Sequence, residues 1–424
     1  MAKLDFKVRQ KIFILTCCSL FGISTPGQAA WLEANGSLRT LGGYSDHYDF
    51  PLLFGNNNSG DFLSYSQARL ILAGKPPVGD LPISYEIHGV ADYLANTQSQ
   101  TANVQGFTDQ SAYQITDASW TPLNHEHQHV TLGFDRFQVK LGLPSLDISV
   151  GRQPIDFSKT YFWNVLDVFR PFSANQYDRD YKKGVDTLRL DIPLGQSSGI
   201  NLIGALGRRI ASDNPAWQGA AVFGRGFINL KGFDVSAQGG KVRGGYHSGL
   251  GIVGELGGLE TRAEGAWFLA DDHSILLPNL TPYYKSHFSS VVGVGRHFQN
   301  TLDLQAEYFF NGGGSEKGDF NAAFWRAANG DLLNWGKHLM GGSIAYEFLP
   351  ILTGQLGYLF SFTDYSSELL PQLKWSVSDN VDALAGALTH FGKRPNGLSV
   401  LGPNFRSEFA SQSDFYYVQL KVYF

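Results

Sequence analysis

The sequence predicts an all-β fold, a transmembrane antiparallel up-and-down β-barrel of about 18 strands, with roughly 16 or 20 as alternatives. Composition is the first observation. The 424 residues include 49 Gly, 31 Phe and 19 Tyr but only 2 Met, and the mean hydropathy is -0.15. No stretch approaches the ~18 consecutive apolar residues of a membrane helix. Many aromatic residues and glycines with a modest mean hydropathy suit strands that are apolar on one face only.

The N-terminal segment is the second observation. Basic residues between Lys3 and Lys11 precede an apolar run over 12–23, and small residues around Ala29 follow. This pattern is typical of a secretory signal peptide, and the run is too short to cross ~30 Å of hydrocarbon as a helix. We therefore expect residues 1–30 to be cleaved after export through the general secretion route, leaving a single barrel over 31–424.

The remainder of the chain contains no cysteine, because Cys17 and Cys18 both lie in the predicted signal peptide. This excludes a disulfide framework and a haem-attachment motif, and we expect no cofactor. Neither cysteine follows a small residue at the end of the apolar run, as a lipid-attachment site would require. The net charge is -5, and the first 30 residues contribute +3, so the remainder carries -8. This balance gives no reason to expect a nucleic-acid partner.

The third observation is the closing stretch from Asp414 to Phe424, where apolar and polar residues alternate with period two. This stretch resembles the terminal strand of Gram-negative outer-membrane β-barrels. The resemblance implies location in the outer membrane, contact with its lipid, and recognition by the barrel-assembly machinery through the strand ending at Phe424. One face of this strand would carry Tyr416, Val418, Leu420, Val422 and Phe424.

The rest of the chain has the pattern of successive hairpins. Tight connections such as 231–232 and 257–258 alternate with longer ones such as 311–337 and 392–413. Short periplasmic turns and long extracellular loops are typical of outer-membrane barrels, and an even strand count places both termini on one side. We expect a long polar loop over 95–128.

Two local features are also predicted. The strand over 130–141 changes parity near Asp135, which indicates a β-bulge there. Residues 321–331 have the composition of a short helix within a loop. Three histidines, His125, His127 and His129, share one face of an extended chain, but no partner set for a metal is visible, so we expect no metal site.

A barrel of about 18 strands is wide enough to leave an aqueous channel unless something fills it. Polar positions of the alternation are candidates to line it. Each such charge either pairs with a neighbour to keep the wall solvated or belongs to a ring that selects permeants. The candidates are Arg39, Arg69, Arg136, Lys140, Arg189, Arg262, Lys374 and Lys421, with Glu33, Glu86, Asp92, Asp191, Glu255, Glu264, Asp303, Glu307 and Glu347.

The connection over 158–183 is too apolar for a freely solvated loop, because its first half is rich in aromatic residues. It either folds into the barrel as a constriction or covers the outer rim, and 164–169 could form one or two helical turns before Pro171. In the first case its charged residues would lie at the narrowest point. These are Asp167, Arg170, Asp178, Arg179, Asp180, Lys182 and Lys183.

Residues 150–190 carry a more specific likeness. Val150-Gly151-Arg152-Gln153, a long loop, and then Asp186-Thr187-Leu188-Arg189-Leu190 resemble the GRQ…D-x-L-R-L pattern of porin-like barrels in the alginate-export group. The resemblance implies an 18-stranded barrel that passes an anionic polysaccharide through a basic lumen. This sequence departs from the group, because its candidate lumen charges are mixed and its net charge is negative.

Three functions remain open from the sequence. The first is a porin-like channel that passes small hydrophilic solutes by diffusion through a mixed-charge lumen. The second is a substrate-specific channel or exporter for an anionic sugar polymer or organic acid. The third is an outer-membrane enzyme or a barrel that holds a partner protein. No nucleophile elbow or HExxH motif occurs, so we expect no enzyme. The oligomeric state is left open.

Overall fold

The computed structural model describes residues 31–48, 60–79, 81–97, 111–115, 117–176, 178–208, 214–271, 275–276, 281–316, 320–399 and 402–424. The predicted signal peptide lies outside these ranges. Almost all regular structure in them is β. The one α-helix they contain, α3 (Phe320–Ala328), overlaps the stretch where a short helix is predicted, although it begins one residue earlier and ends three residues earlier.

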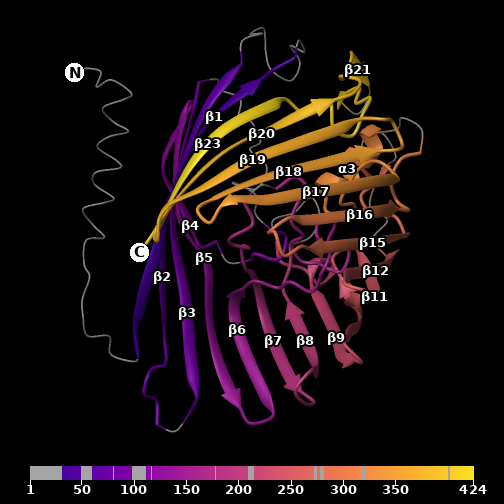
Figure 1. The fold of residues 1–424 in the computed structure, drawn as a ribbon. Helices are drawn as coiled ribbons and strands as arrows, with labels where there is room; N and C mark the ends of the chain where they lie inside the picture. Colours follow the sequence, from indigo (N-terminus) through magenta and orange to yellow (C-terminus); the bar gives the residue numbers. More distant parts are fainter. Residues whose placement is uncertain are drawn as a thin grey trace, which may run out of the picture.

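One sheet contains nineteen strands. Each pairs antiparallel with its neighbours, and the last strand pairs with the first, so that the sheet closes on itself (Figure 1). Within the described parts of the chain, β4 pairs with β5 alone, and the other eighteen strands run round the barrel, as predicted. The strands are β1 (Glu33–Asp46), β2 (Asp61–Gly74), β3 (Ile83–Asn96), β4 (Ser119–His125), β5 (Gln128–Leu143), β6 (Leu146–Gln153), β7 (Val185–Pro193), β8 (Ser198–Ala205), β9 (Ala221–Leu230), β10 (Phe233–Val242), β11 (Gly245–Leu256), β12 (Leu259–Ala270), β15 (His287–His297), β16 (Asp303–Asn311), β17 (His338–Leu349), β18 (Leu352–Ser361), β19 (Ser367–Ser378), β20 (Val381–Phe391) and β23 (Asp414–Tyr423).

Two further pairs of two-residue strands lie in the loops, β13 (Ile275–Leu276) with β14 (Thr281–Pro282) and β21 (Leu398–Ser399) with β22 (Gly402–Pro403). A 3₁₀ turn, η1, covers Trp217–Gly219. No helix among the described residues is long and apolar enough to cross a bilayer.

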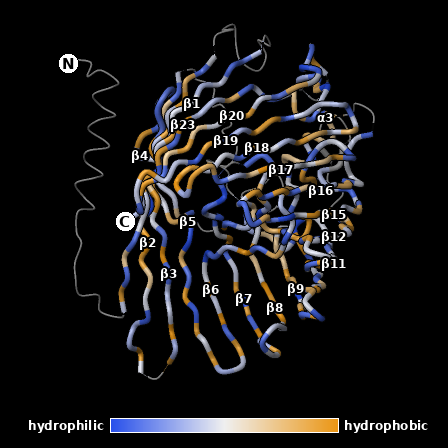
Figure 2. The backbone as a smooth tube through the Cα atoms, in the orientation of Figure 1, coloured by the Kyte–Doolittle hydropathy of each residue, from blue (hydrophilic) through white to orange (hydrophobic). Residues whose placement is uncertain are grey.

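The strands alternate between an apolar outer face and a more polar inner face, which is the period-two pattern of the sequence. In β23, Val418 is 62% exposed on the outer face while Gln419 and Lys421 are 4% and 5% exposed on the inner face. Figure 2 shows this alternation of hydropathy along the strands. The predicted assignment of the closing strand is thus confirmed, and the outer belt can contact lipid without exposing unpaired backbone groups.

The connections fall into two sets at opposite ends of the barrel. Tight turns occupy one end, and the turn at Gly257–Gly258 has positive φ at both positions (62° and 78°), as a two-residue hairpin of type I′ requires. Longer loops occupy the other end, with Arg243–Gly244 as a short exception. We refer to these as the short-turn end and the long-loop end.

The predicted bulge is confirmed. β3 pairs with β5 through His88 with Arg136 and then Gly89 with Phe134, so that Asp135 is the extra residue. The prediction of a loop over 95–128 is partly wrong, because β4 forms within it. β6 ends partway along β5, and β4 pairs with the part of β5 beyond that point. The sequence of β4 does not reveal this backbone partner.

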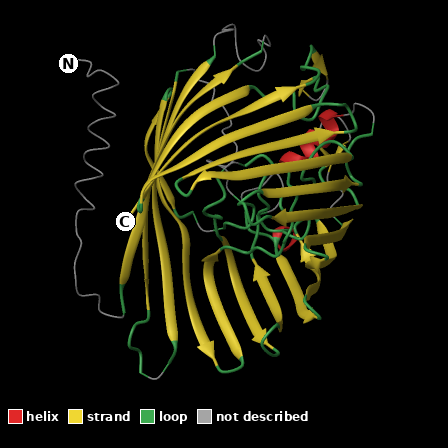
Figure 3. Cartoon of the chain, in the orientation of Figure 1, coloured by secondary structure: helices red, strands yellow, loops and turns green. Residues whose placement is uncertain are grey.

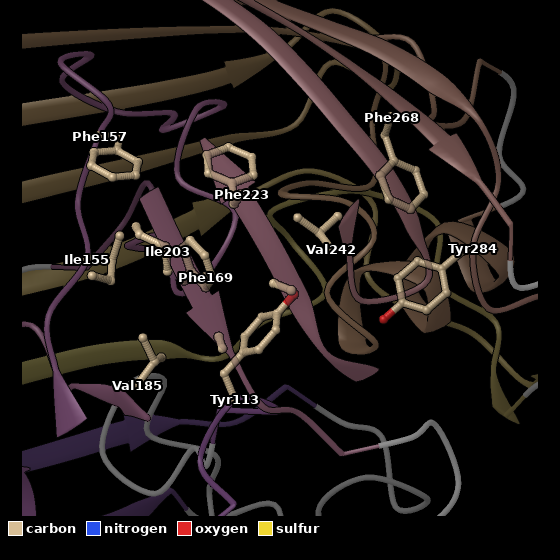
Figure 4. Close-up of a cluster of buried hydrophobic side chains, with 12 residues drawn as sticks. Tyr113, Ile155, Phe157, Phe169, Val185, Ile203, Phe223, Val242, Phe268 and Tyr284 are labelled. Atoms are coloured by element: carbon tan, nitrogen blue, oxygen red, sulfur yellow. The ribbon is translucent and has the colours of Figure 1, made fainter. Parts of the chain in front are cut away.

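The barrel is not hollow at mid-height. Two clusters of buried apolar side chains lie against the inner wall, and both include residues from the connection between β6 and β7. Figure 4 shows one of them, in which Phe157 and Phe169 of that connection face Phe223 and Ile203 of the wall. The interior core of the molecule is therefore formed between the wall and this connection.

Candidate functional site: a loop folded into the barrel

The connection from β6 to β7, residues 154–184, is here named the inward loop. β6 and β7 end at Gln153 and begin at Val185, well short of the long-loop end reached by β5, so the chain leaves the wall at this level. Loop segments lie within the ring of strands in Figure 3. Contacts with β1, β5, β12, β16, β17, β19 and β23 show that the inward loop crosses the lumen.

Glycines of the wall make room for the apolar half of this loop. A Cβ at Gly341 of β17 would lie 2.7 Å from the Phe162 ring, and a Cβ at Gly249 of β11 would lie 2.5 Å from Leu166. Trp163 is 1% exposed and stacks on Phe309 of β16 with ring centroids 5.4 Å apart. Burial of these side chains supplies the main apolar contribution to holding the loop against the wall.

Two carboxylates of the wall bind the backbone of the loop. Glu264 accepts hydrogen bonds from Ser158 Oγ and from the Lys159 N–H, both at 2.6 Å. Glu307 accepts the N–H groups of Tyr161 and Phe162. Both glutamates are at most 3% exposed. A buried carboxylate needs hydrogen-bond donors, and a loop without secondary structure leaves backbone N–H groups without acceptors. The glutamates and the loop N–H groups therefore satisfy each other.

The second half of the loop lies against a basic wall. Asp178 accepts a hydrogen bond from Arg39 of β1 at 2.9 Å, and Asp180 pairs with Lys421 of β23 at 2.7 Å. The Tyr181 ring lies 4.9 Å from the Arg39 guanidinium and 4.4 Å from that of Arg69, distances at which a cation–π attraction operates.

Charges within the loop are also paired. Arg179 donates to the carbonyls of Tyr161, Ser173, Ala174 and Gln176, and Lys182 pairs with Asp167. Burial raises the pKa of Asp167, although the neighbouring Lys182 opposes the shift. For Asp180, burial would raise the pKa, but the hydrogen bond and charge of Lys421 together with the charge of Arg39 lower it overall.

The expected helical turns at 164–169 do not form. A single turn is closed by the Asp167 N–H on the Asn164 carbonyl at 3.2 Å, and the backbone otherwise follows the wall. The wall contacts of Trp163 and Leu166 on either side of Asn164 favour an irregular path over a helix.

The predicted lining charges mostly form pairs. Most of these pairs join residues along one strand or on neighbouring strands, whereas Arg69 with Asp135 and Arg262 with Glu307 each reach across one intervening strand. They are Arg69 with Asp135 (2.5 Å), Arg136 with Glu86 (3.8 Å), Lys140 with Asp147 (2.7 Å), Arg189 with Asp191 (2.8 Å), Arg262 with Glu260 (2.7 Å) and Glu307 (3.5 Å), Lys374 with Asp382 (3.0 Å), and Asp303 with His297 (3.6 Å).

The remaining candidates lie apart from this set. Asp92 accepts hydrogen bonds from Tyr65 and Gln67, whereas Glu33, Glu255 and Glu347 are exposed near the short-turn rim. Lys183 and Arg170 line the cavity described next.

A cavity of about 520 Å³ lies between the inward loop and the long-loop end, bounded by β11, β12, β15 and the segment after α3. Apolar groups such as Phe169 and Phe268 and polar groups such as His247, His287 and Asp331 share its lining. Outside the strands, burial raises the pKa of Asp331 to about 6, against the opposing charge of Arg326.

Sequence reasoning missed three contributors to the site. Asp135 was predicted as a bulge but not as the partner of Arg69, and Tyr181 was not distinguished from the other loop aromatics. Glu368 of β19, fully buried, accepts hydrogen bonds from Asn175 Nδ2 of the loop at 3.2 Å and lies 3.3 Å from His390 of the neighbouring strand β20. Its signal was available only as the one acidic residue of the strand Ser367–Ser378.

No family model and no curated protein matches the chain. Solved structures do match in fold. OccAB3 of Acinetobacter baumannii has a TM-score of 0.54 and 11% identity, covering 93% of this chain and 99% of that one. OpdK, an outer membrane protein of Pseudomonas aeruginosa, gives 0.56 and 9%, covering 94% and 100%. OccK11 (OpdR) of Pseudomonas aeruginosa gives 0.55 and 11%, covering 94% and 98%.

The TM-scores and the coverages show a shared fold over nearly the whole of each chain, and at identities this low they show the fold alone. The chain thus folds as a closed antiparallel barrel of eighteen strands, and its fold is similar to that of these solved outer-membrane proteins.

Proposed function

We propose that the protein is an outer-membrane channel that passes small hydrophilic solutes by diffusion through a lumen of mixed charge. The inward loop carries this proposal. It is bound to the wall on opposite sides, through Glu264 and Glu307 on one side and Arg39 and Lys421 on the other. A barrel narrowed at mid-height by a fixed loop limits solute size while the barrel itself stays wide.

The lining supports passage of solutes of either sign. Towards the short-turn end, partly exposed pairs such as Lys140 with Asp147 and Arg189 with Asp191 keep the wall hydrated. Paired charges present both donors and acceptors to a solute but little net potential. A hydrophilic solute can therefore replace its contacts with water by contacts with the wall, and it meets no electrostatic barrier that excludes charges of one sign.

The location and orientation belong to the same proposal. The short-turn end, where β1 begins and β23 ends, faces the periplasm, and the long-loop end faces outward. Residues 1–30 direct export, the strand ending at Phe424 is recognised by the barrel-assembly machinery, and the exposed belt contacts outer-membrane lipid. We propose no catalytic, metal or cofactor role for any residue.

Conductance tests this function directly. The purified barrel, reconstituted in a planar bilayer, should give stepwise ion currents. A variant in which 158–183 is replaced by a Gly/Ser linker should conduct more, because the narrowing element is gone. Folding is checked by the shift in electrophoretic migration on heating. A folded wild-type protein without current, or a linker variant with unchanged conductance, contradicts the proposal.

An organic-acid channel is the second candidate, and the basic wall around Arg39 favours it. Another solved structure of similar fold shows OpdK of Pseudomonas aeruginosa with vanillate. An exporter of an anionic polysaccharide, as the alginate-export likeness implies, would need a continuous basic path, whereas the cations here are mostly matched by acids. Competition of vanillate with chloride current separates the solute-specific channel from a general one.

A further inference from the structure

Four cations lie on the inner wall formed by β23, β1, β2, β3 and β5. Arg39 and Lys421 are direct cross-strand neighbours, Arg69 lies on the next strand, β2, and Arg136 lies on β5, beyond β3. We call these four residues the basic groove. Like charges directly opposite each other destabilise a strand pair, so Arg39 and Lys421 require counter-charges. Both are nearly buried, at 7% and 5% exposure, which increases that requirement.

The wall itself supplies only half of the counter-charge. Asp135 pairs with Arg69 at 2.5 Å, and Glu86 lies 3.8 Å from Arg136. Asp382, the cross-strand neighbour of Lys421, pairs instead with Lys374 at 3.0 Å. Among the described residues, Arg39 and Lys421 therefore have ion-pair partners only in the inward loop.

The loop presents two carboxylates to these two cations. Asp178 contacts Arg39 at 2.9 Å and Lys421 at 3.2 Å, and Asp180 contacts Lys421 at 2.7 Å and Arg39 at 3.5 Å. Each carboxylate thus bridges both cations. Gln419 and the Tyr423 hydroxyl donate to the same pair of carboxylates at 3.4 and 3.3 Å.

This arrangement has the form of a filled binding site. The carboxylates of Asp178 and Asp180 stand where two anionic groups of one small molecule would bind. We propose that the basic groove is a binding site for a small dicarboxylate, and that Asp178 and Asp180 are its built-in occupants. The dicarboxylate would be a permeant, so the inference rests on the proposed channel function and names its solute class.

Exchange needs little rearrangement. Arg179 is bound to loop carbonyls, including that of Tyr161 beside the Glu307 anchor, so the backbone can stay while the two aspartate side chains turn away. The contacts that are lost are ion pairs and hydrogen bonds, which a dicarboxylate restores group for group. A monocarboxylate restores only one of the two charges and leaves a buried cation without a partner.

Calorimetry on the full barrel, folded in detergent at low salt, tests the site without relying on conductance. Glutarate and butyrate are the probes, since they share a chain type and differ in the second carboxylate. Wild type should bind glutarate more tightly than butyrate. Asp178→Asn with Asp180→Asn should tighten glutarate binding about tenfold or more, because the apparent Kd is the intrinsic Kd divided by the fraction of molecules whose groove is free.

Three controls define the result. Asp234→Asn removes one exposed carboxylate outside the groove, bonded to Asn229 rather than to a cation, and should leave glutarate affinity unchanged. Arg39→Gln, placed on the double-asparagine background, should abolish the gain. Should the double variant fail to fold, Asp180→Asn alone should shift affinity in the same direction by a smaller factor. Equal affinity for glutarate and butyrate, or weaker glutarate binding after loss of the aspartates, overturns the inference.

Bilayer recordings keep the two proposals separate. Glutarate should reduce chloride current at concentrations where butyrate does not, and the double variant should be more sensitive. A protein that binds glutarate but carries no current refutes the channel and retains the site. A protein that conducts but binds glutarate no better than butyrate retains the channel and refutes the site.

Discussion

The Trp163 indole Nε1 donates to Asn334 Oδ1 at 2.8 Å, joining the inward loop to the loop between β16 and β17. Asn334 in turn donates to Glu408 at 2.9 Å in the loop between β20 and β23. One continuous set of contacts thus runs from the middle of the lumen to the long-loop end. A substitution at either end should therefore weaken the contacts along the whole set.

Trp163→Ala should loosen the inward loop. The side chain is 1% exposed, and truncation of a buried tryptophan costs about 3–5 kcal/mol. We expect noisier and larger single-channel currents, with a lower temperature for the loss of heat-modifiable migration. Trp217→Ala is the matched control, because Trp217 is 65% exposed. Unchanged current in Trp163→Ala would show that the loop is held by its polar contacts alone.

Glu307→Ala should release the first half of the loop. Two backbone N–H groups, those of Tyr161 and Phe162, would lose their acceptor, at a cost of about 1–3 kcal/mol for each buried group. Conductance should rise towards that of the linker variant. Glu255→Ala, an exposed acid at the rim, should leave both conductance and stability as in wild type.

Gly341→Leu should displace Phe162, because even a Cβ at this position would lie 2.7 Å from the ring. Gly226→Leu provides the comparison, since nothing lies within 4 Å of a Cβ built there. We expect faster proteolysis between residues 158 and 183 in the first variant only. Equal proteolysis of the two variants would mean that Phe162 relocates at no cost.

Closure of the loop around the buried Glu408 should become less stable as pH rises. Burial raises its pKa to about 7, although Asn334 and the N–H groups of Gly336 and Trp335 oppose the shift. The pKa of Glu408 is higher when the loop is closed than when it is open, so protonation favours the closed loop. This stabilisation is fully present below the ordinary pKa of 4.5 and is lost as pH rises through 7. Hydrogen exchange of the backbone amides of 402–411, corrected for the intrinsic chemical rate, should therefore become faster as pH rises.

Glu408→Gln is the control for this pH dependence. The amide does not titrate, so exchange of the same segment should be flat between about pH 4.5 and 7, apart from the intrinsic chemical rate. A wild-type profile that is equally flat would contradict the raised pKa of Glu408.

Strand period, turn chemistry and the parity slip at Asp135 are local properties, so the sequence by itself determined the barrel, its strand number, and which face of β23 meets lipid. The sequence also indicated an inward loop as one of two alternatives, from aromatic residues that need a surface to pack on. Pairing of lumen charges, by contrast, joins residues far apart in the chain, such as Arg39 with Asp178.

The tertiary structure alone decided where the loop lies and which cations it neutralises. Ring closure brings β23 beside β1, which places Lys421 opposite Arg39 although nearly the whole chain separates them. Two buried like charges in register demand counter-charges, and only the folded loop brings Asp178 and Asp180 to them. Periodicity fixes the direction in which a side chain points, whereas the partner it meets across the lumen depends on closure of the barrel.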